Sequence, residues 1–479
     1  MINIKHKRQR HIINVKILYA FLIFVGFAVI YDQVKLRRER DSIVDLHQME
    51  AEGELRALTL YSPTTYFIYR DKEMGYEYEI CSEMAKSLGL KLKMVVAPNQ
   101  KAMMEMLERG EGDLIANNIP ITLNIKNEYL FCGREYLTHQ VLVQRKNAPS
   151  EMLTDVTDLI GKEVLVQSNT TYETRLRHLN NEIGGGILIQ TVNEDSLSVE
   201  DMIEMVAMGK IDYTIADNNI AQFNKTYYSN ISTSLMLGFN QHSSWVVRKS
   251  SPLLAEAINK WFRDNVQTQK YKLTNKRYFE LMKGPSPFRT SGLNIGKNGQ
   301  ISAYDELFRK YARKISWDWR LLASIAYQES NLDPHVTNSW TGASGLMQIM
   351  PKTARSLGLD MHKLLEAETS ILGAAKLLKT YERGLSGVTN QEQRTKMTLA
   401  SYNCGFGHIL DARALARKYK KNPNLWDGDN VGKFIYLKSR PEYYQDPVCK
   451  QGYLRGSETA AFVTEVWTRY KYYSKKVPL

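Results

Sequence analysis

Glu329 could do acid–base chemistry because of where it falls in its own predicted helix. In the stretch RLLASIAYQESNLDP (320–334), apolar residues recur with a helical period, and Glu329 follows Ile325 by four positions and Leu321 by eight. It therefore falls on the apolar face, close to the C-terminal end of that helix. A carboxylate is costly to desolvate there, and the helix dipole adds to the cost.

Two interpretations of Glu329 follow from this position. A glutamate at the edge of an apolar face usually reaches solvent or pairs with a lysine or arginine. Alternatively, its surroundings keep it protonated, so that it can donate a proton near neutral pH. The other motifs of the chain decide between them.

Four stretches of the C-terminal part resemble the motifs of the lysozyme-like lytic transglycosylases, the SLT family. They are AYQESNLDP (326–334), GASGLMQIMPKTARSLG (342–358), LASYNCGFGHILDARALARK (399–418) and YYQDPVCKQGYLRGSETAAFV (443–463). The resemblance implies that Glu329 is the single catalytic acid/base and acts on the bond between N-acetylmuramic acid and N-acetylglucosamine. It also implies a 1,6-anhydro product, because the sugar's own C6 hydroxyl closes the ring. One group that acts first as acid and then as base needs a pKa near the working pH.

The same resemblance implies substrate-binding roles for six residues: Ser339, Ser344, Gln348, Met350, Tyr402 and Asn403. Either serine could hold a sugar or its acetamido group, since the segment TNSWTG is one residue longer than the common pattern. Met350 has core packing as its alternative, and a core tyrosine is the alternative for Tyr402. Phe462 stands where the family often has a tyrosine, and phenylalanine cannot donate a hydrogen bond.

The chain that precedes these motifs alternates between strand and helix. This alternation predicts a largely parallel α/β sheet, and a second such run starts near residue 161. Beyond Ile301 we expect helices and loops and no strand. The first run comprises a strand at 55–62, a helix ending at Gly89, a strand at 91–98, a helix at 100–112 and a strand at 113–117.

Residues 55–285 resemble the type 3 family of periplasmic solute-binding proteins. The segments TTYFIYRDKEMGYEYEICSEMAKSLGLKL, ERGEGDLIANNIPIT and GKIDYTIADNNIA carry this resemblance. It implies two α/β lobes, hinged near 143–147 and 241–245, with a ligand cleft between them. Asp217 and Tyr66 are the residues that we assign to that ligand.

A free α-amino acid is a doubtful ligand for this domain. The family usually clamps the ligand carboxylate with an arginine, but Ile125 stands at the aligned position and Lys126 follows it. A lysine cannot make the bidentate contact of a guanidinium group. We therefore expect a peptide or a muropeptide fragment as ligand.

The order of the two domains resembles that of the membrane-bound lytic murein transglycosylase F family. The predicted fold is multidomain, with a two-lobed, periplasmic-binding-protein-like α/β domain followed by a mainly α, lysozyme-like domain. Its segments are a basic N-terminus and signal anchor (1–34), a linker (35–54), the solute-binding-like domain (55–285), a second linker (286–300) and the lytic transglycosylase domain (301–479).

The N-terminal segment indicates export. ILYAFLIFVGFAVIY (17–31) carries no charge and follows a basic start, as in an uncleaved signal anchor, with a cleaved signal as the alternative. We therefore expect the remaining chain on the periplasmic side of a bacterial membrane. The formal net charge is +13, but residues 1–40 alone contain nine Lys/Arg against Asp32 and Glu39. The body is thus only mildly basic, which suits an anionic polymer such as peptidoglycan as partner.

Nothing in the sequence indicates a cofactor, a metal or a nucleic-acid partner. The four cysteines, Cys81, Cys132, Cys404 and Cys449, lack metal-ligand spacing, and they could pair or remain free thiols. No P-loop or nucleic-acid motif is present. We expect His362 and His408 to be solvated.

Two rival functions share most of these features. A hydrolytic muramidase on the same fold would need a second carboxylate to activate water, and Asp333 or an acid after Asp427 could supply it. A non-enzymatic peptidoglycan sensor would keep the fold but lose the chemistry. The intact QES, GLMQIMP and SYN stretches favour an enzyme.

Overall fold

The structure is a computed structural model that describes residues 45–70, 72–146, 152–193, 197–281, 295–296, 299–338 and 341–478. The expected signal anchor and most of the second linker lie outside these residues. No helix in the described part is both long and apolar enough to cross a membrane. The described chain divides into two compact units, which we treat separately.

The first unit comprises the described parts of Met1–Thr59, Cys81–Glu135 and Ser244–Asp264. Its sheet has the strand order β4-β1-β5-β12-β6, and β1 pairs in parallel with β4 and β5. The strands are β1 (Glu54–Thr59), β4 (Lys91–Val96), β5 (Leu114–Pro120), β6 (Tyr129–Thr138) and β12 (Gln241–Arg248). Its helices are α2 (Leu46–Glu52), most of α3 (Tyr76–Ser87), α4 (Gln100–Glu108), α5 (Leu123–Glu128) and most of α9 (Pro252–Asn265).

Helix α2 corrects the expected linker at 35–54. Asp45 caps this helix, and its carboxylate also accepts hydrogen bonds from the backbone amides of Leu253 and Leu254 in α9. Met49 is fully buried. One buried side chain and one cap therefore fix a segment whose charged composition resembles that of a linker.

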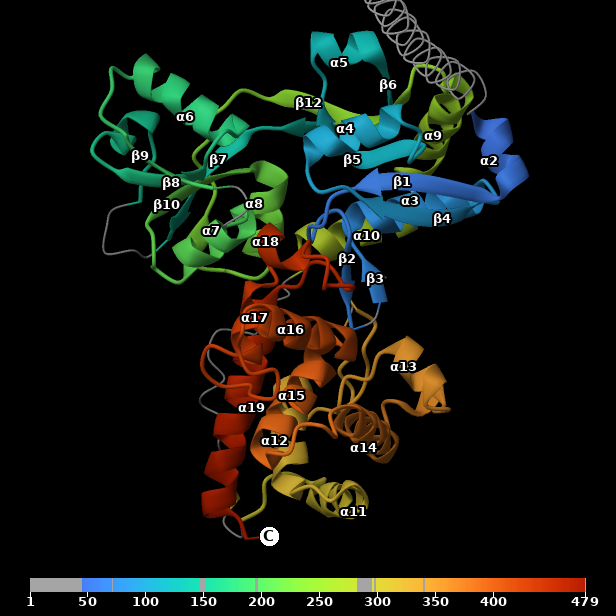
Figure 1. The fold of residues 1–479 in the computed structure, drawn as a ribbon, viewed down its shortest axis with the longest axis vertical. Coiled ribbons are helices and arrows are strands. Elements are labelled where there is room, and N and C mark those ends of the chain that lie inside the picture. Colours follow the sequence, from blue (N-terminus) through green and yellow to red (C-terminus); the bar gives the residue numbers. More distant parts are fainter. Residues whose placement is uncertain are drawn as a thin grey trace, which may run out of the picture. The chain divides into compact units, whose positions relative to one another are not determined.

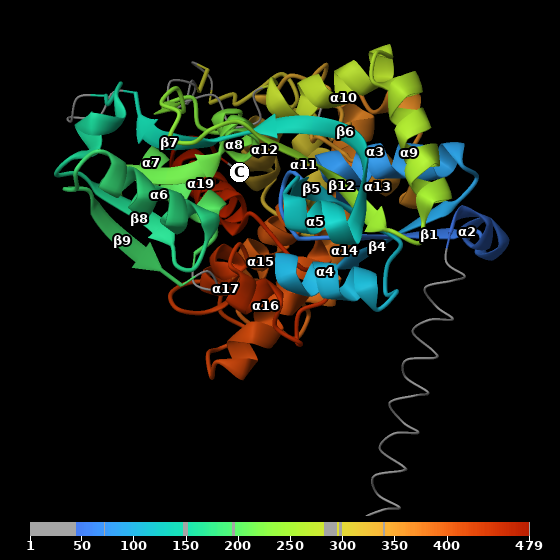
Figure 2. The same ribbon diagram turned by 90° about the horizontal axis from the view of Figure 1, so that it is seen from above.

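The second unit comprises Leu60–Ile80, Tyr136–Ser243 and Asn265–Leu479. Its sheet has the order β11-β7-β10-β8-β9, with α6 on one face and α7 and α8 on the other (Figures 1 and 2). The elements are β7 (Gln140–Arg145), the 3₁₀ helix η1 (Val156–Leu159), β8 (Glu163–Gln167), α6 (Thr171–Glu182), β9 (Leu188–Val192), α7 (Val199–Ala207), β10 (Tyr213–Asp217), α8 (Asn218–Lys225), β11 (Ile231–Ser232) and α10 (Gln269–Phe279).

The chain passes between the units at Glu135/Tyr136 and at Ser243/Ser244. The second passage agrees with the predicted hinge at 241–245. The first predicted hinge, 143–147, does not coincide with a passage: residues 143–145 belong to β7 inside the second unit, and residue 147 lies outside the described part of the chain.

A short hairpin also belongs to the second unit. It consists of β2 (Phe67–Tyr69) and β3 (Lys72–Met74), paired antiparallel, and we call it the hairpin. Its turn includes Arg70, whose backbone is left-handed with φ 49°. Such a conformation is uncommon for a residue other than glycine and requires support from its surroundings.

The helical part of the second unit begins near residue 301 and contains no strand among its described residues, as predicted. Its elements are α11 (Asp305–Ile315), α12 (Trp319–Ser330), α13 (Pro351–Ser356), η3 (Met361–Lys363), α14 (Ala367–Gly384), α15 (Gln391–Cys404), α16 (Phe406–Lys418), α17 (Val431–Leu437), α18 (Pro441–Tyr444) and α19 (Gly456–Lys476). Helix α12 packs against α11 and α19 (Figure 1).

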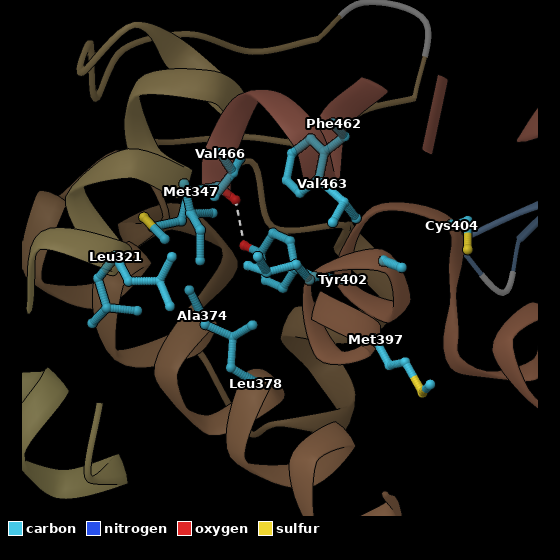
Figure 3. Packing of buried hydrophobic residues seen from close by; sticks show 14 of the residues in the cluster. Leu321, Met347, Ala374, Leu378, Met397, Tyr402, Cys404, Phe462, Val463 and Val466 are labelled. Carbon is cyan, nitrogen blue, oxygen red and sulfur yellow. Dashed lines mark hydrogen bonds between the residues drawn. The ribbon is translucent and has the colours of Figure 1, made fainter. Parts of the chain in front are cut away.

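One hydrophobic core holds these helices together. Figure 3 shows Tyr402 of α15 among Met347, Phe462 and Val466. Met347 and Ile349 are fully buried in this core. All four cysteines lie in the described part of the chain, and each is a free thiol.

Candidate active site

Glu329 is the penultimate residue of α12. Asp318 caps the start of this helix by accepting a hydrogen bond from the Arg320 amide, and Asn331 ends it in the left-handed conformation. The Ser330 hydroxyl donates to the Leu346 carbonyl at 2.8 Å, which ties the helix end to the GLMQIMP segment. Gly345 begins that segment with φ +81°, and a Cβ atom there would lie 1.9 Å from the Leu364 carbonyl oxygen. Glycine is therefore required where this loop packs against Leu364.

Glu329 lines a cavity of about 380 Å³ within the second unit. Gln348, Asn403 and Phe462 of the helical part also line it. The α/β part of the same unit also contributes to the lining, through Tyr69, Arg70, Met208, Tyr227 and Tyr228. Both polar and apolar groups face the cavity, as is usual for a ligand-binding site.

Arg70, in the turn of the hairpin, contacts Glu329 directly. Its Nη2 atom donates to Glu329 Oε1 at 2.8 Å, and the two side chains are only 11% and 8% exposed. Arg70 also donates through Nε to the Asn403 carbonyl at 2.9 Å and through Nη1 to the Gln348 carbonyl at 3.2 Å. Its backbone amide donates to the Cys404 carbonyl at 3.3 Å. This set of contacts explains how the strained backbone of Arg70 is held.

Burial controls the electrostatics of this pair. It raises the pKa of Glu329; Arg70 opposes the rise, and the Glu458 carboxylate adds to it. Burial lowers the pKa of Arg70, but Glu329 raises it well above its ordinary value. Arg70 therefore remains charged, and among the described residues it is the one hydrogen-bond donor to Glu329. If Arg70 withdrew, the burial of Glu329 would favour its protonated form.

Glu458 and Glu465 of α19 also line the cavity; both are among the acids after Asp427 that the sequence left open, and neither was singled out. Glu458 lies in the first turn of α19, on the same helix face as Phe462. The Tyr69 hydroxyl donates to Glu458 Oε1 at 3.4 Å. Burial raises the pKa of Glu458, and Arg455 and then Arg70 oppose this rise. The signal in the sequence was the ETAAF stretch, where Glu458 precedes Phe462 by one helical turn.

Only some of the predicted substrate-binding residues line the cavity. Gln348 and Asn403 line the cavity, whereas Ser344 and Met350 are not among its lining residues. The Ser344 hydroxyl donates to the Gly342 carbonyl, and Met350 is buried at the start of α13. Ser339 lies outside the described residues. Gln348 has a left-handed backbone with φ 48°, which turns its carbonyl toward Arg70.

Tyr402 is buried in the core, is not among the residues that line the cavity, and makes a buried hydrogen bond. Its hydroxyl donates to the Met347 carbonyl at 2.6 Å, drawn as a dashed line in Figure 3, and the Arg70 guanidinium lies 5.9 Å from the centre of its ring. Tyr402 thus connects α15 with the GLMQIMP segment.

Tyr402→Phe is expected to lower the free energy of unfolding by about 1–3 kcal/mol, because it leaves the buried Met347 carbonyl without its donor. Urea denaturation would measure the change. Tyr419→Phe is the matched control, since Tyr419 is exposed and is expected to change little. Equal stability of Tyr402→Phe and the wild type would contradict a structural role for this hydroxyl.

A buried cluster holds the base of the hairpin against the helical part. Lys438 is fully buried and donates to Asp411 Oδ2 at 2.6 Å and to His408 Nδ1 at 3.0 Å. Because Nδ1 accepts, Nε2 carries the proton and donates to the Ile68 carbonyl of β2 at 3.2 Å. Burial, and then the charge of Lys438, lowers the pKa of His408 well below its usual range. The expectation of a solvated His408 was therefore wrong.

The residues assigned to the ligand of the α/β domain have different surroundings. Asp217 stands at the start of α8 without capping it, and its carboxylate accepts a hydrogen bond from the Tyr172 hydroxyl at 3.2 Å. Burial raises its pKa. Tyr66 is buried, and its hydroxyl donates to Glu73 of β3 at 2.7 Å. Ile125 and Lys126 lie in α5 of the first unit.

Comparison with known proteins matches both parts of the chain. Residues 55–281 match the family described as bacterial extracellular solute-binding proteins, family 3, and residues 306–425 match the transglycosylase SLT domain. An ancestral cationic amino acid solute binding protein of known structure aligns with 49% of this chain and 99% of its own, at 19% identity and a TM-score of 0.43.

Two relatives align with nearly the whole chain. The membrane-bound lytic murein transglycosylase F of Pseudomonas fluorescens (strain Pf0-1) is 32% identical over 423 residues, which cover 88% of this chain and 85% of the relative. The protein of the same name from Aeromonas salmonicida (strain A449) is 30% identical over 453 residues, covering 94% and 88%. The similarity therefore extends through both domains in the same order.

Proposed function

We propose a product and a means of control for this chain, which belongs to the membrane-bound lytic murein transglycosylase F family and is a peptidoglycan lytic transglycosylase. The proposed product carries a 1,6-anhydromuramoyl end, and Glu329 is the proposed acid/base. One observation carries this assignment: Glu329 is a desolvated carboxylate on the cavity wall whose one hydrogen-bond donor among the described residues is Arg70.

In the proposed reaction, protonated Glu329 gives its proton to the glycosidic oxygen, and the bond from that oxygen to C1 of the muramic acid breaks. The 2-acetamido group of the same sugar assists at C1. Glu329, now a carboxylate, takes the proton of the C6 hydroxyl, and O6 bonds to C1. The reaction consumes no water, and Glu329 ends in the protonated form in which it began. A group with a pKa raised by burial suits both steps.

Mass spectrometry of digested peptidoglycan tests this product. The full chain is expected to release muropeptides that are one water lighter than reducing ends, because ring closure replaces hydrolysis. A muramidase would give reducing ends instead, with a second acid such as Glu458 activating water. Digestion in H₂¹⁸O is the control, since hydrolysis incorporates the label and ring closure does not. Labelled reducing ends as the main product would reject the proposal.

We also propose that the solute-binding domain regulates the site through the hairpin. In this structure, Arg70 donates a hydrogen bond to Glu329, and Tyr69 donates one to Glu458. Neither carboxylate is therefore free to contact a glycan strand. Withdrawal of the hairpin would free both. The hairpin belongs to the segment that matches the solute-binding family, so a ligand of that domain has a direct structural connection to the catalytic acid.

The proposed ligand is a peptide or muropeptide. The absence of an arginine at Ile125 argues against a carboxylate clamp for a free amino acid. Asp217 is the proposed partner of a ligand amine, since its carboxylate lacks a cation in hydrogen-bond contact among the described residues. The surroundings of Tyr66 instead favour packing at the base of the hairpin. We place the body of the chain in the periplasm, attached to the membrane through residues 17–31.

A further inference from the structure

One face of α19 lines the cavity over two helical turns. Glu458, Phe462 and Glu465 follow one another at spacings of four and three residues, so they lie on the same side of the helix. At a rise of about 1.5 Å per residue, Glu465 lies about 10 Å farther along the helix axis than Glu458. A glycan strand in this cavity would therefore meet the two carboxylates at different points along its length.

Glu465 is exposed, yet two side chains fix its orientation. Gln328, near the end of α12, also lines the cavity, and its Nε2 atom donates to Glu465 Oε2 at 2.6 Å. Gln328 Oε1 accepts from Arg469 Nη2 at 3.0 Å. Arginine can only donate and a carboxylate can only accept, so the amide must lie this way round.

Arg469 is itself anchored to α12. Its Nη1 atom donates to the Ser324 carbonyl at 3.2 Å, and its guanidinium lies 4.3 Å from the centre of the Tyr327 ring. Helix α12 packs against α19 along this stretch (Figure 1). The chain of contacts from Arg469 through Gln328 therefore orients the Glu465 carboxylate before any ligand binds, which lowers the entropy cost of binding.

Glu465 keeps one carboxylate oxygen available to a ligand. Its Oε1 atom accepts no hydrogen bond from any described residue. Ala461 and Phe462, one turn earlier on α19, also line the cavity and add apolar surface. Ligand cavities commonly combine an apolar lining with a few oriented polar groups. A sugar ring has hydroxyl and N–H donors at its edge and C–H groups on its faces, so this combination suits it.

The charge of Arg469 favours a neutral donor at this position. Arg469 follows Glu465 by one helical turn and is joined to it through Gln328. Its positive charge reduces the attraction of Glu465 for a further cation. A hydroxyl or an amide N–H is not repelled in this way. The surroundings of Glu465 therefore favour groups of the sugars over the ammonium groups of the peptides that the glycan carries.

We infer, on the basis of the proposed function, that Glu465 is a substrate-binding residue whose free carboxylate oxygen accepts hydrogen bonds from hydroxyl or acetamido N–H groups of the glycan strand. Gln328 is a positioning residue that acts through Glu465, and Arg469 holds Gln328. No proton is transferred at Glu465. The contact is the same in the ground state and in the transition state, so it contributes to binding of the strand and not to the chemical step.

Steady-state kinetics of the full chain on purified peptidoglycan test this role. Glu465→Ala is expected to raise KM about tenfold and to leave kcat within about twofold, because loss of a uniform binding contact changes KM alone. Thr464→Ala is the matched control, since Thr464 is exposed on the same helix and its hydroxyl donates to the Ala460 carbonyl of that helix. It is expected to change neither constant.

A second substrate separates sugar from peptide. In peptidoglycan whose free peptide amines have been acetylated, the ammonium groups are gone and the sugars are unchanged. The rise in KM of Glu465→Ala is expected to be the same on this substrate. Its disappearance would assign Glu465 to an ammonium group of the peptide and overturn the inference.

Gln328→Ala tests the positioning role. It is expected to raise KM about fivefold in the wild type and to add nothing in Glu465→Ala, because a residue that acts only through its partner has no effect once the partner is gone. A further rise in the double variant would show that Gln328 binds the strand itself and would reject its positioning role. If Glu465→Ala does not fold, an unchanged KM in Gln328→Ala overturns the inference.

An unchanged KM in a folded Glu465→Ala chain would overturn the inference directly. A large loss of kcat would also overturn it, since Glu465 would then take part in the reaction itself. The rates count all soluble muropeptides, whichever end they carry, and mass spectrometry identifies that end separately. Failure of the proposed function is therefore distinguishable from failure of this inference.

Discussion

Glu329→Gln is expected to abolish most of the release of 1,6-anhydromuropeptides. General acid/base catalysis is worth about 10²- to 10⁴-fold in rate, and the loss should lie toward the upper end because one residue serves both steps. Glutamine keeps an oxygen that can accept the Arg70 hydrogen bond, but it cannot deliver a proton. Chromatography of muropeptides released from purified peptidoglycan would measure the loss.

The control for this variant is Glu306→Gln, which replaces an exposed glutamate on the neighbouring helix α11. Circular dichroism of both variants would show whether the fold is kept. A folded Glu329→Gln chain that works at near the wild-type rate would leave Glu329 as an ordinary buried partner of Arg70. It would also mean that another acid of the chain does the chemistry, such as one of those that the hydrolytic rival requires.

Arg70→Ala is expected to raise kcat/KM without added ligand by about 10- to 100-fold. The variant loses three side-chain hydrogen bonds, of which the one to Glu329 joins two charges. A hydrogen bond to a charged group contributes about 1.5–3 kcal/mol, and each 1.4 kcal/mol changes an equilibrium about tenfold. The equilibrium between the state in which Arg70 contacts Glu329 and the state in which the hairpin has withdrawn should therefore move toward the withdrawn state by a similar factor. Initial rates on purified peptidoglycan would measure the change.

Arg177→Ala is the matched control, because Arg177 is an exposed arginine on α6 that pairs with Glu173 within its own helix. It is expected to leave the rate unchanged. A muropeptide that activates the wild type should have little further effect on Arg70→Ala, since both act on the same equilibrium. A folded Arg70→Ala chain with wild-type or lower activity would show that Arg70 supports the site instead of blocking it.

The sequence was informative wherever a property depends on neighbouring residues. The helical period around Ile325 predicts α12, and the structure confirms this helix and the buried place of Leu321 and Ile325; Glu329 lines the cavity and pairs with Arg70. The alternation of strand and helix after Leu55 predicts the first sheet closely, since β1, α3, β4, α4 and β5 appear in that order. Local patterns sufficed because burial of one face per element is a local requirement.

The surroundings of Glu329 could not be predicted in the same way. Arg70 precedes it by 259 residues, and nothing in the TTYFIYRDKEMG stretch distinguishes an arginine that reaches another domain from one in solvent. The prediction for His408 was wrong for a similar reason. Its neighbours in sequence suggest a helix surface, but it is buried in contact with Lys438 and the Ile68 carbonyl. Both contacts depend on how separate elements pack, which no single segment encodes.

The contacts of the hairpin also indicate which mutations could activate this enzyme, by breaking the contact between Arg70 and Glu329. Three of the four groups that accept hydrogen bonds from Arg70 are backbone carbonyls, of Asn403, Gln348 and Cys404, and the fourth is the Glu329 carboxylate. Backbone carbonyls are present whatever the side chain, and in the proposed reaction the Glu329 carboxylate cannot change without loss of turnover. A genetic selection for overactive, lytic alleles should therefore yield substitutions in the hairpin and at His408, which supports it. Substitutions of the groups that accept hydrogen bonds from Arg70 should not appear among the active alleles.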